Sequence, residues 1–147
     1  MTENSRKLED LEDKITEYLS ENRDTAHFNS LKGVVIMLAI NACDDLDQEL
    51  RSTLEKALEL WRNSASFEEI SDNLIERCRQ NLNKAIKEAG ADSKDAWLAR
   101  LNYTSLHNTP EDDDTLLTLI LEYSTTNDLD IDELSKLLTD QFPDFNI

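Results

Sequence analysis

The chain has 147 residues, 32 of them acidic and 15 basic, which gives a formal net charge of −17. This length suits a single domain, residues 1–147, and a domain of that size buries about 70% of the surface of its unfolded chain. So large an excess of carboxylates disfavours direct binding to nucleic acid, because proteins contact phosphates with Lys and Arg. Apolar residues recur at helical spacing along most of the sequence, which distinguishes it from a disordered acidic tail.

The first three predicted helices differ in how their apolar residues are spread. Residues 4–20 carry them on one face, at spacings typical of a helix. Residues 28–43 include the run 34–40, which is apolar on nearly every side. A helix without a polar face is predicted to lie in the middle of a core. Residues 45–61 carry a stripe of leucines that ends at Trp61, so this helix is predicted to pack along one side.

The fourth and fifth predicted helices have clear boundary signals. The motif Ser66-Phe67-Glu68-Glu69 is typical of a capping box, and apolar residues keep helical spacing from there to Ile86. Gly90 suits the left-handed backbone conformation just past a helix end. The fifth helix is predicted to begin after Ser93 and to include Leu106.

The last two predicted helices begin at acidic segments. Thr109 followed by Pro110 indicates a cap with proline at the first helical position, and this helix is predicted to include Tyr123. Asp130-Ile131-Asp132-Glu133 opens the seventh helix, which is predicted to end at Pro143.

The predicted fold class is all-α, an irregular bundle or array of about seven helices. No segment alternates apolar and polar residues for long enough to indicate a strand. The most buried residues are predicted to be those on the apolar stripes and in the all-round apolar segments. They are Val35, Leu38, Leu54, Leu58, Leu74, Leu82, Leu101 and Ile120.

Motifs for catalysis and metal binding are missing from the sequence. His27 and His107 belong to no zinc-binding pattern, and the two glycines are too isolated for a phosphate-binding loop. The segment Asp128-Leu129-Asp130-Ile131-Asp132 resembles the opening of a calcium loop. However, its sixth position is Glu133 and its twelfth is Thr139, where such a loop needs Gly and Glu. We therefore expect no enzymatic activity, no cofactor and no bound metal.

Three features favour a cytoplasmic protein that contacts no membrane. The charged start of the chain is not followed by the apolar stretch of a signal peptide. The longest apolar run, residues 34–40, is far shorter than a membrane span. Cys43 and Cys78 are most simply explained as reduced thiols on helices.

The acidic charge is concentrated towards the C-terminus, since residues 91–147 hold 13 acidic and 3 basic residues. One cluster is Glu111-Asp112-Asp113-Asp114, and the other lies between residues 128 and 133. Acidic residues favour the first turn of a helix, where the dipole is positive, so both clusters suit solvated helix starts. Three consecutive aspartates exceed what a cap needs, so a binding surface is the other interpretation. The residues predicted to contact a partner are Asp112, Asp113, Asp114, Tyr123, Asp128, Asp130, Asp132 and Glu133.

Two helical segments, Leu54–Trp61 and Ala96–Tyr103, are similar in outline to segments of helical immunity proteins. These small acidic proteins belong to bacterial polymorphic-toxin and contact-dependent inhibition systems. The resemblance implies a protein that binds its cognate toxin domain, often a basic nuclease, and blocks it. The alternatives are a regulatory adaptor or secretion-type chaperone, for which an apolar groove matters more, and an acidic mimic of nucleic acid.

Overall fold

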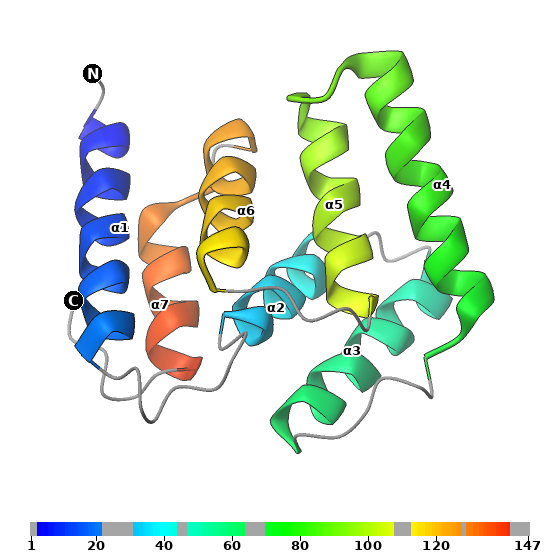
Figure 1. Cartoon of the computed structure of the whole chain (residues 1–147), viewed down its shortest axis with the longest axis horizontal. Helices are drawn as coiled ribbons and strands as arrows, with labels where there is room; N and C mark the ends of the chain where they lie inside the picture. Colours follow the sequence, from blue (N-terminus) through cyan, green and yellow to red (C-terminus); the bar gives the residue numbers. More distant parts are fainter. Residues whose placement is uncertain are drawn as a thin grey trace.

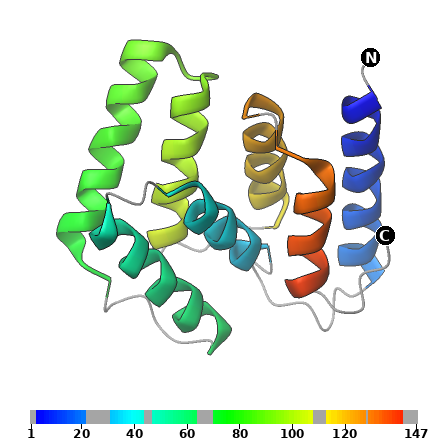
Figure 2. The ribbon, with the colours of Figure 1, turned by 180° about the vertical axis from the view of Figure 1, so that it is seen from behind.

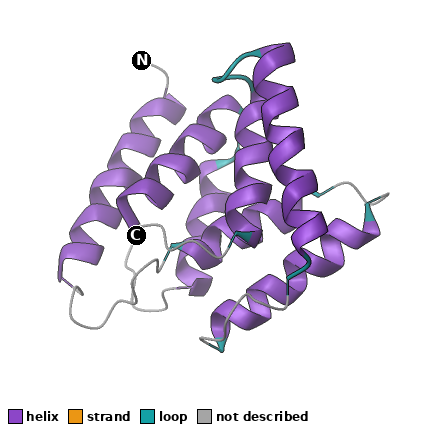
Figure 3. Cartoon of the chain, turned by 45° about the vertical axis from the view of Figure 1, so that its right-hand side comes forward, coloured by secondary structure: helices purple, strands orange, loops and turns teal. Residues whose placement is uncertain are grey.

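The computed structural model describes residues 3–21, 31–43, 47–63, 70–107, 113–127 and 129–141. Within these ranges the chain forms seven helices and no strand, as Figure 3 shows, so the predicted all-α class is confirmed. The helices are α1 (Glu3–Glu21), α2 (Lys32–Ala42), α3 (Gln48–Arg62), α4 (Asp72–Ala89), α5 (Lys94–Leu106), α6 (Asp113–Thr126) and α7 (Ile131–Gln141).

Helix α2 lies at the centre of the molecule. It packs against α3, α5, α6 and α7, and Figure 1 shows α1, α6 and α7 on one side of it and α3, α4 and α5 on the other. Figure 2, from behind, shows α7 beside α1. The run from Val34 to Ile36 has no exposed surface, and Leu38 is 2% exposed. The position predicted from the apolar run is therefore confirmed, because a helix with no polar face is stable only where other helices cover it.

A buried lysine stands at the start of α2. Lys32 is 6% exposed, and its Nζ donates a hydrogen bond of 2.8 Å to the main-chain oxygen of His107, just past the end of α5. A cation at the C-terminal end of a helix interacts favourably with the helix dipole. Lys32 thus joins the beginning of α2 to the end of α5.

Helices α4 and α5 form an antiparallel pair joined by a short turn (Figure 1). Gly90 ends α4 with the predicted positive φ, 100°, and its amide donates to Ile86 O at 2.9 Å. The Oγ of Ser93 accepts a hydrogen bond of 3.1 Å from Ala96 N and donates one of 2.8 Å to Gly90 O. Both sequence signals at this turn are confirmed, because each residue satisfies helix-end groups that have no partner inside a helix.

The starts of α3 and α4 differ from the predicted ones. α3 begins at Gln48 rather than at residue 45, because the carboxylate of Asp47 accepts from Leu50 N at 3.1 Å and so takes the N-cap. α4 begins at Asp72, with Ser71 in an extended conformation before it, so the predicted helix does not run through residues 70 and 71. The capping-box motif 66–69 lies outside the described residues, as do Thr109 and Pro110 before α6.

Six of the eight residues predicted to be most buried are buried, and Leu58 and Leu82 are half-buried. α3 faces the core along Leu50, Leu54 and Ala57, which leaves Leu58 beside that stripe. Leu82 lines a cleft between α4, α5 and α6. No helix in the described ranges is long and apolar enough to cross a membrane.

Candidate protein-binding surface

Helix α6 separates two hollows on the surface of the molecule. Its exposed residues, Thr115, Thr118, Glu122 and Thr125, follow one another at helical spacing. The opposite side of α6 is buried in the core. One hollow lies towards α1 and the other towards α5, and Thr118 borders both.

The hollow between α1 and α6 has acidic sides and an apolar floor. Its volume is about 300 Å³. We call it the acidic groove, and its lining residues are Leu8, Glu9, Glu12, Thr118, Leu121, Glu122 and Thr125. The three glutamates are exposed, whereas Leu8 and Leu121 are half-buried. None of the lining residues is basic, so the groove presents carboxylates around a small apolar surface.

Packing of α1 positions the groove. Leu11 and Ile15 are each 2% exposed and anchor α1 in the core, and α1 packs against both α6 and α7. Glu9 and Glu12 lie beside this apolar stripe, at the edge that meets α6. Because side chains three and four residues apart share a face of a helix, anchoring the stripe also fixes the direction of the glutamates.

Three of the predicted partner-binding acids lie at the start of α7. Asp130, Asp132 and Glu133 are exposed. The Oδ1 of Asp130 accepts a hydrogen bond of 2.9 Å from Asp132 N, so Asp130 also caps the helix. α7 follows α6 after a short connection, and Figure 1 shows its start near the end of α6 and the N-terminal half of α1. None of the three is among the residues that line the acidic groove.

Tyr123 does not lie on this surface. It is 6% exposed, at helical spacing from Leu116 and Ile120, which are fully buried. Burial, with the nearby charge of Glu133, raises the pKa of its phenol. Tyr123 is one of the residues predicted to contact a partner, but α6 turns it towards the core and leaves little of it exposed.

Three of the remaining predicted residues belong to the other acidic cluster, and Asp128 belongs to the cluster before α7. Asp113 and Asp114 form the beginning of α6, and their side chains are not described. Asp112 and Asp128 lie outside the described residues. Among the predicted acids whose side chains the structure describes, those at the start of α7 lie together.

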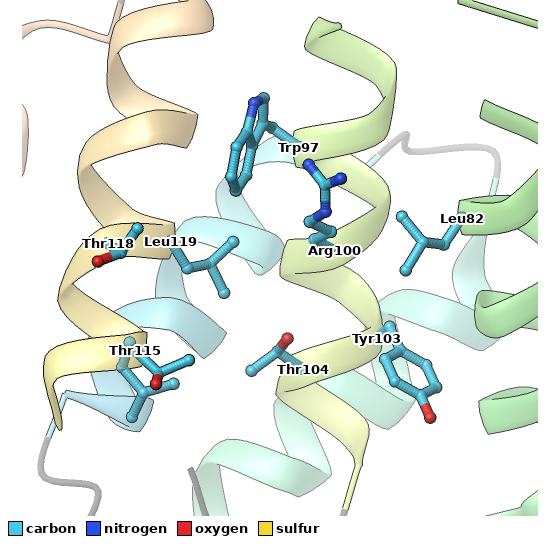
Figure 4. Close-up of a pocket in the computed structure, with 9 residues that line it drawn as sticks. Leu82, Trp97, Arg100, Tyr103, Thr104, Thr115, Thr118 and Leu119 are labelled. Carbon is cyan, nitrogen blue, oxygen red and sulfur yellow. The ribbon is translucent and has the colours of Figure 1, made fainter. Parts of the chain in front are cut away.

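The second hollow, which we call the α5–α6 cleft, has a volume of about 350 Å³ (Figure 4). Its lining residues are Leu82, Trp97, Arg100, Tyr103, Thr104, Thr115, Leu116, Thr118 and Leu119. The Arg100 guanidinium lies 4.2 Å from the centre of the Trp97 ring, and Arg100 Nη1 donates to Ala91 O at 2.6 Å. The Tyr103 ring packs at a tilt of 35° against the His107 ring, with ring centres 4.8 Å apart.

Sequence reasoning missed both hollows. Trp97 and Tyr103 are both half-buried at the α5–α6 cleft. Glu9 and Glu12 carry no sequence signal beyond their place on a polar helix face. Each hollow is formed by helices distant in the chain, so no local pattern marks it.

The described residues show no metal or thiolate chemistry. Among them, no three His, Cys, Asp or Glu side chains are grouped so that they could hold a metal ion. Both cysteines are free thiols. Burial raises the pKa of the Cys78 thiol to about 11, although the Arg77 charge opposes this shift, so the thiol stays protonated near neutral pH.

Comparison with protein-family models, with curated proteins and with solved structures gives no match.

Proposed function

We propose that this protein is an immunity-type inhibitor that binds a basic toxin domain and blocks it. The observation that carries the proposal is the acidic groove, in which Glu9, Glu12 and Glu122 surround an apolar floor without a basic lining residue. Asp130 and Asp132 add exposed charge at the start of α7.

The hydrocarbon stem and the charged end of a partner's lysine or arginine side chain both suit this groove. Its hydrocarbon stem packs on Leu8 and Leu121, and its charged end meets the glutamate carboxylates. Hydrogen bonds between charged groups are about twice as strong as neutral ones. Covering the cations that a nuclease uses for phosphate blocks its substrate site. The net charge of −17 increases the rate of encounter with a basic domain.

The test uses a triple variant, Glu9→Gln, Glu12→Gln and Glu122→Gln, with the product of the adjacent gene as the candidate partner. A matched control, Glu55→Gln, Glu59→Gln and Glu88→Gln, removes three exposed charges from α3 and α4. We expect the groove variant to associate about tenfold more slowly at about 50 mM salt, and the control to change far less. Equal effects of the two variants, or no binding of the unmodified protein, would contradict the proposal.

The α5–α6 cleft favours a second candidate function, an adaptor or secretion-type chaperone that binds an apolar segment of its client. Leucines and aromatic rings dominate its lining. Salt separates the two functions, because apolar binding responds little to ionic strength whereas charge-steered association slows steeply. Association that is unchanged between about 50 mM and about 500 mM salt would favour the chaperone.

A further inference from the structure

The proposed inhibitor function uses the acidic groove and leaves the α5–α6 cleft without a role. The cleft lies between three helices, and its volume of about 350 Å³ is within the range of sites for small molecules. This volume equals that of about a dozen water molecules, at roughly 30 Å³ each. Leu82, Leu116 and Leu119 line it together with the Trp97 and Tyr103 rings. Its walls therefore suit a small ligand with an apolar body.

The charge of the cleft is opposite to that of the rest of the molecule. Arg100 is the charged residue among those that line it, in a chain with 32 acidic and 15 basic residues. Contact with the Trp97 ring at 4.2 Å and a 2.6 Å hydrogen bond to Ala91 O hold the guanidinium against the wall. A guanidinium has five N–H donors, so this bond leaves most of its donor capacity available.

Two hydrogen-bond donor groups lie at this end of the cleft, the Arg100 guanidinium and the Trp97 indole. Figure 4 shows the Arg100 guanidinium next to the Trp97 ring, with Thr104 and Tyr103 at the other end. Trp97 Nε1 is enclosed and has no hydrogen-bond partner among the described residues. The planar guanidinium of Arg100 matches the two oxygens of a carboxylate.

We propose that the α5–α6 cleft binds a small aromatic or alkyl carboxylate of about a dozen non-hydrogen atoms. Its apolar body packs against Leu82 and Leu119, and its carboxylate pairs with Arg100. An amine of the same shape would place a second cation beside Arg100, and a neutral alcohol would forgo the charge-assisted hydrogen bonds. The cleft is therefore selective for the charge of the ligand as well as its shape.

Long-range repulsion by the net charge of −17 does not oppose such binding at ordinary salt. At about 0.15 M ionic strength, charges are screened beyond roughly 8 Å. None of the residues that line the cleft is acidic. The local field at Arg100 therefore determines which ligand is preferred.

Fluorescence of Trp97 tests the proposal directly. The chain has two tryptophans, so Trp61→Phe leaves Trp97 as the single reporter. This protein is titrated at about 0.15 M salt with 3-phenylpropionate, 3-phenylpropanol and 3-phenylpropylamine. We expect a saturable change with the carboxylate at about 1 mM or below, and binding of the amine at least about tenfold weaker. Equal binding of the carboxylate and the amine, or no saturation by the carboxylate at about 10 mM, would overturn the proposal.

A second comparison assigns the site to Arg100. Arg100→Gln is expected to weaken carboxylate binding by about tenfold or more, whereas Arg62→Gln removes the same charge at the exposed end of α3 and leaves binding unchanged. If a variant fails to give a helical circular dichroism spectrum, methyl NMR shifts of Leu82 and Leu119 in the unmodified protein decide. If the carboxylate but not the amine shifts these methyl signals, the ligand binds in the cleft. If the carboxylate shifts only the signals of residues outside the cleft, the proposed site is excluded.

Discussion

At the residue scale, Gly90 is the position where the backbone demands one residue type. Its φ of 100° and ψ of 156° lie in a region that only glycine adopts without strain. A Cβ added there would meet nothing within 4 Å, so the cost of a side chain comes from the backbone conformation alone.

We predict that Gly90→Ala lowers the free energy of unfolding by about 1–3 kcal/mol. Urea unfolding followed by circular dichroism measures this change. Asp92→Ala, an exposed substitution in the same turn, is the control and is expected to change stability by less than about 0.5 kcal/mol. An equal effect of both substitutions would show that the φ of Gly90 is not the cause.

Cys78 gives a prediction about alkaline pH. Its folded-state pKa of about 11 lies above the ordinary value of 9.0 because the thiol is buried. Because the thiol has a higher pKa in the folded state, it contributes its full stabilisation at pH values below its pKa in the unfolded chain. This contribution is lost as the pH rises towards its pKa in the folded state. By pH 10 the loss is about 1.4 kcal/mol relative to neutral pH.

We predict that the unmodified protein loses stability between about pH 8 and pH 10, and that Cys78→Ala loses about 1.4 kcal/mol less over the same range. Urea unfolding of each protein at several pH values gives the slope of its unfolding free energy against pH. Parallel slopes would mean that the Cys78 thiol ionises as readily in the folded state as in the unfolded one.

At the scale of single helices, α4 and α5 offer a matched pair of N-terminal serines. Ser93 Oγ accepts from Ala96 N at 3.1 Å, whereas the side chain of Ser71 makes no such bond to α4. A serine side chain stabilises a helix start by accepting from an amide of the first turn.

We predict that Ser93→Ala lowers the free energy of unfolding by about 1 kcal/mol, and Ser71→Ala by much less. Thermal unfolding of the two variants under one set of conditions compares them. A larger loss for Ser71→Ala would contradict the assignment of the cap to Ser93 alone.

At the scale of the whole molecule, the net charge of −17 opposes compaction by self-repulsion. Ion pairs such as Arg77 with Asp47, at 3.1 Å, offset it only locally. Both partners are substantially exposed, so the contribution of each such pair is small.

We predict that the thermal midpoint rises by several degrees between about 20 mM and about 500 mM sodium chloride, because salt screens this repulsion. Differential scanning calorimetry measures the shift. The triple variant Asp112→Asn, Asp113→Asn and Asp114→Asn is expected to show a smaller rise and a level or slightly higher midpoint at low salt. A midpoint that falls with salt would mean that attractive ion pairs outweigh the repulsion.

Features that depend on near neighbours in the chain can be predicted from the sequence. The all-helical class, the central position of α2, the turn at Gly90 and the cap at Ser93 each follow from a few consecutive residues. The spacing of apolar residues indicates which segment forms a helix. A helix that is apolar on every side must be covered by other helices.

The positions of the two hollows follow from how distant helices pack, not from any local segment. α6 is apolar on most of its circumference, so its sequence does not say that Tyr123 faces inward and Thr118 outward. The acidic groove exists because α1 packs on α6, and the α5–α6 cleft because α5 and α6 leave space between their side chains. Such packing is the sum of many weak contacts between residues far apart in the chain, and no short segment encodes it.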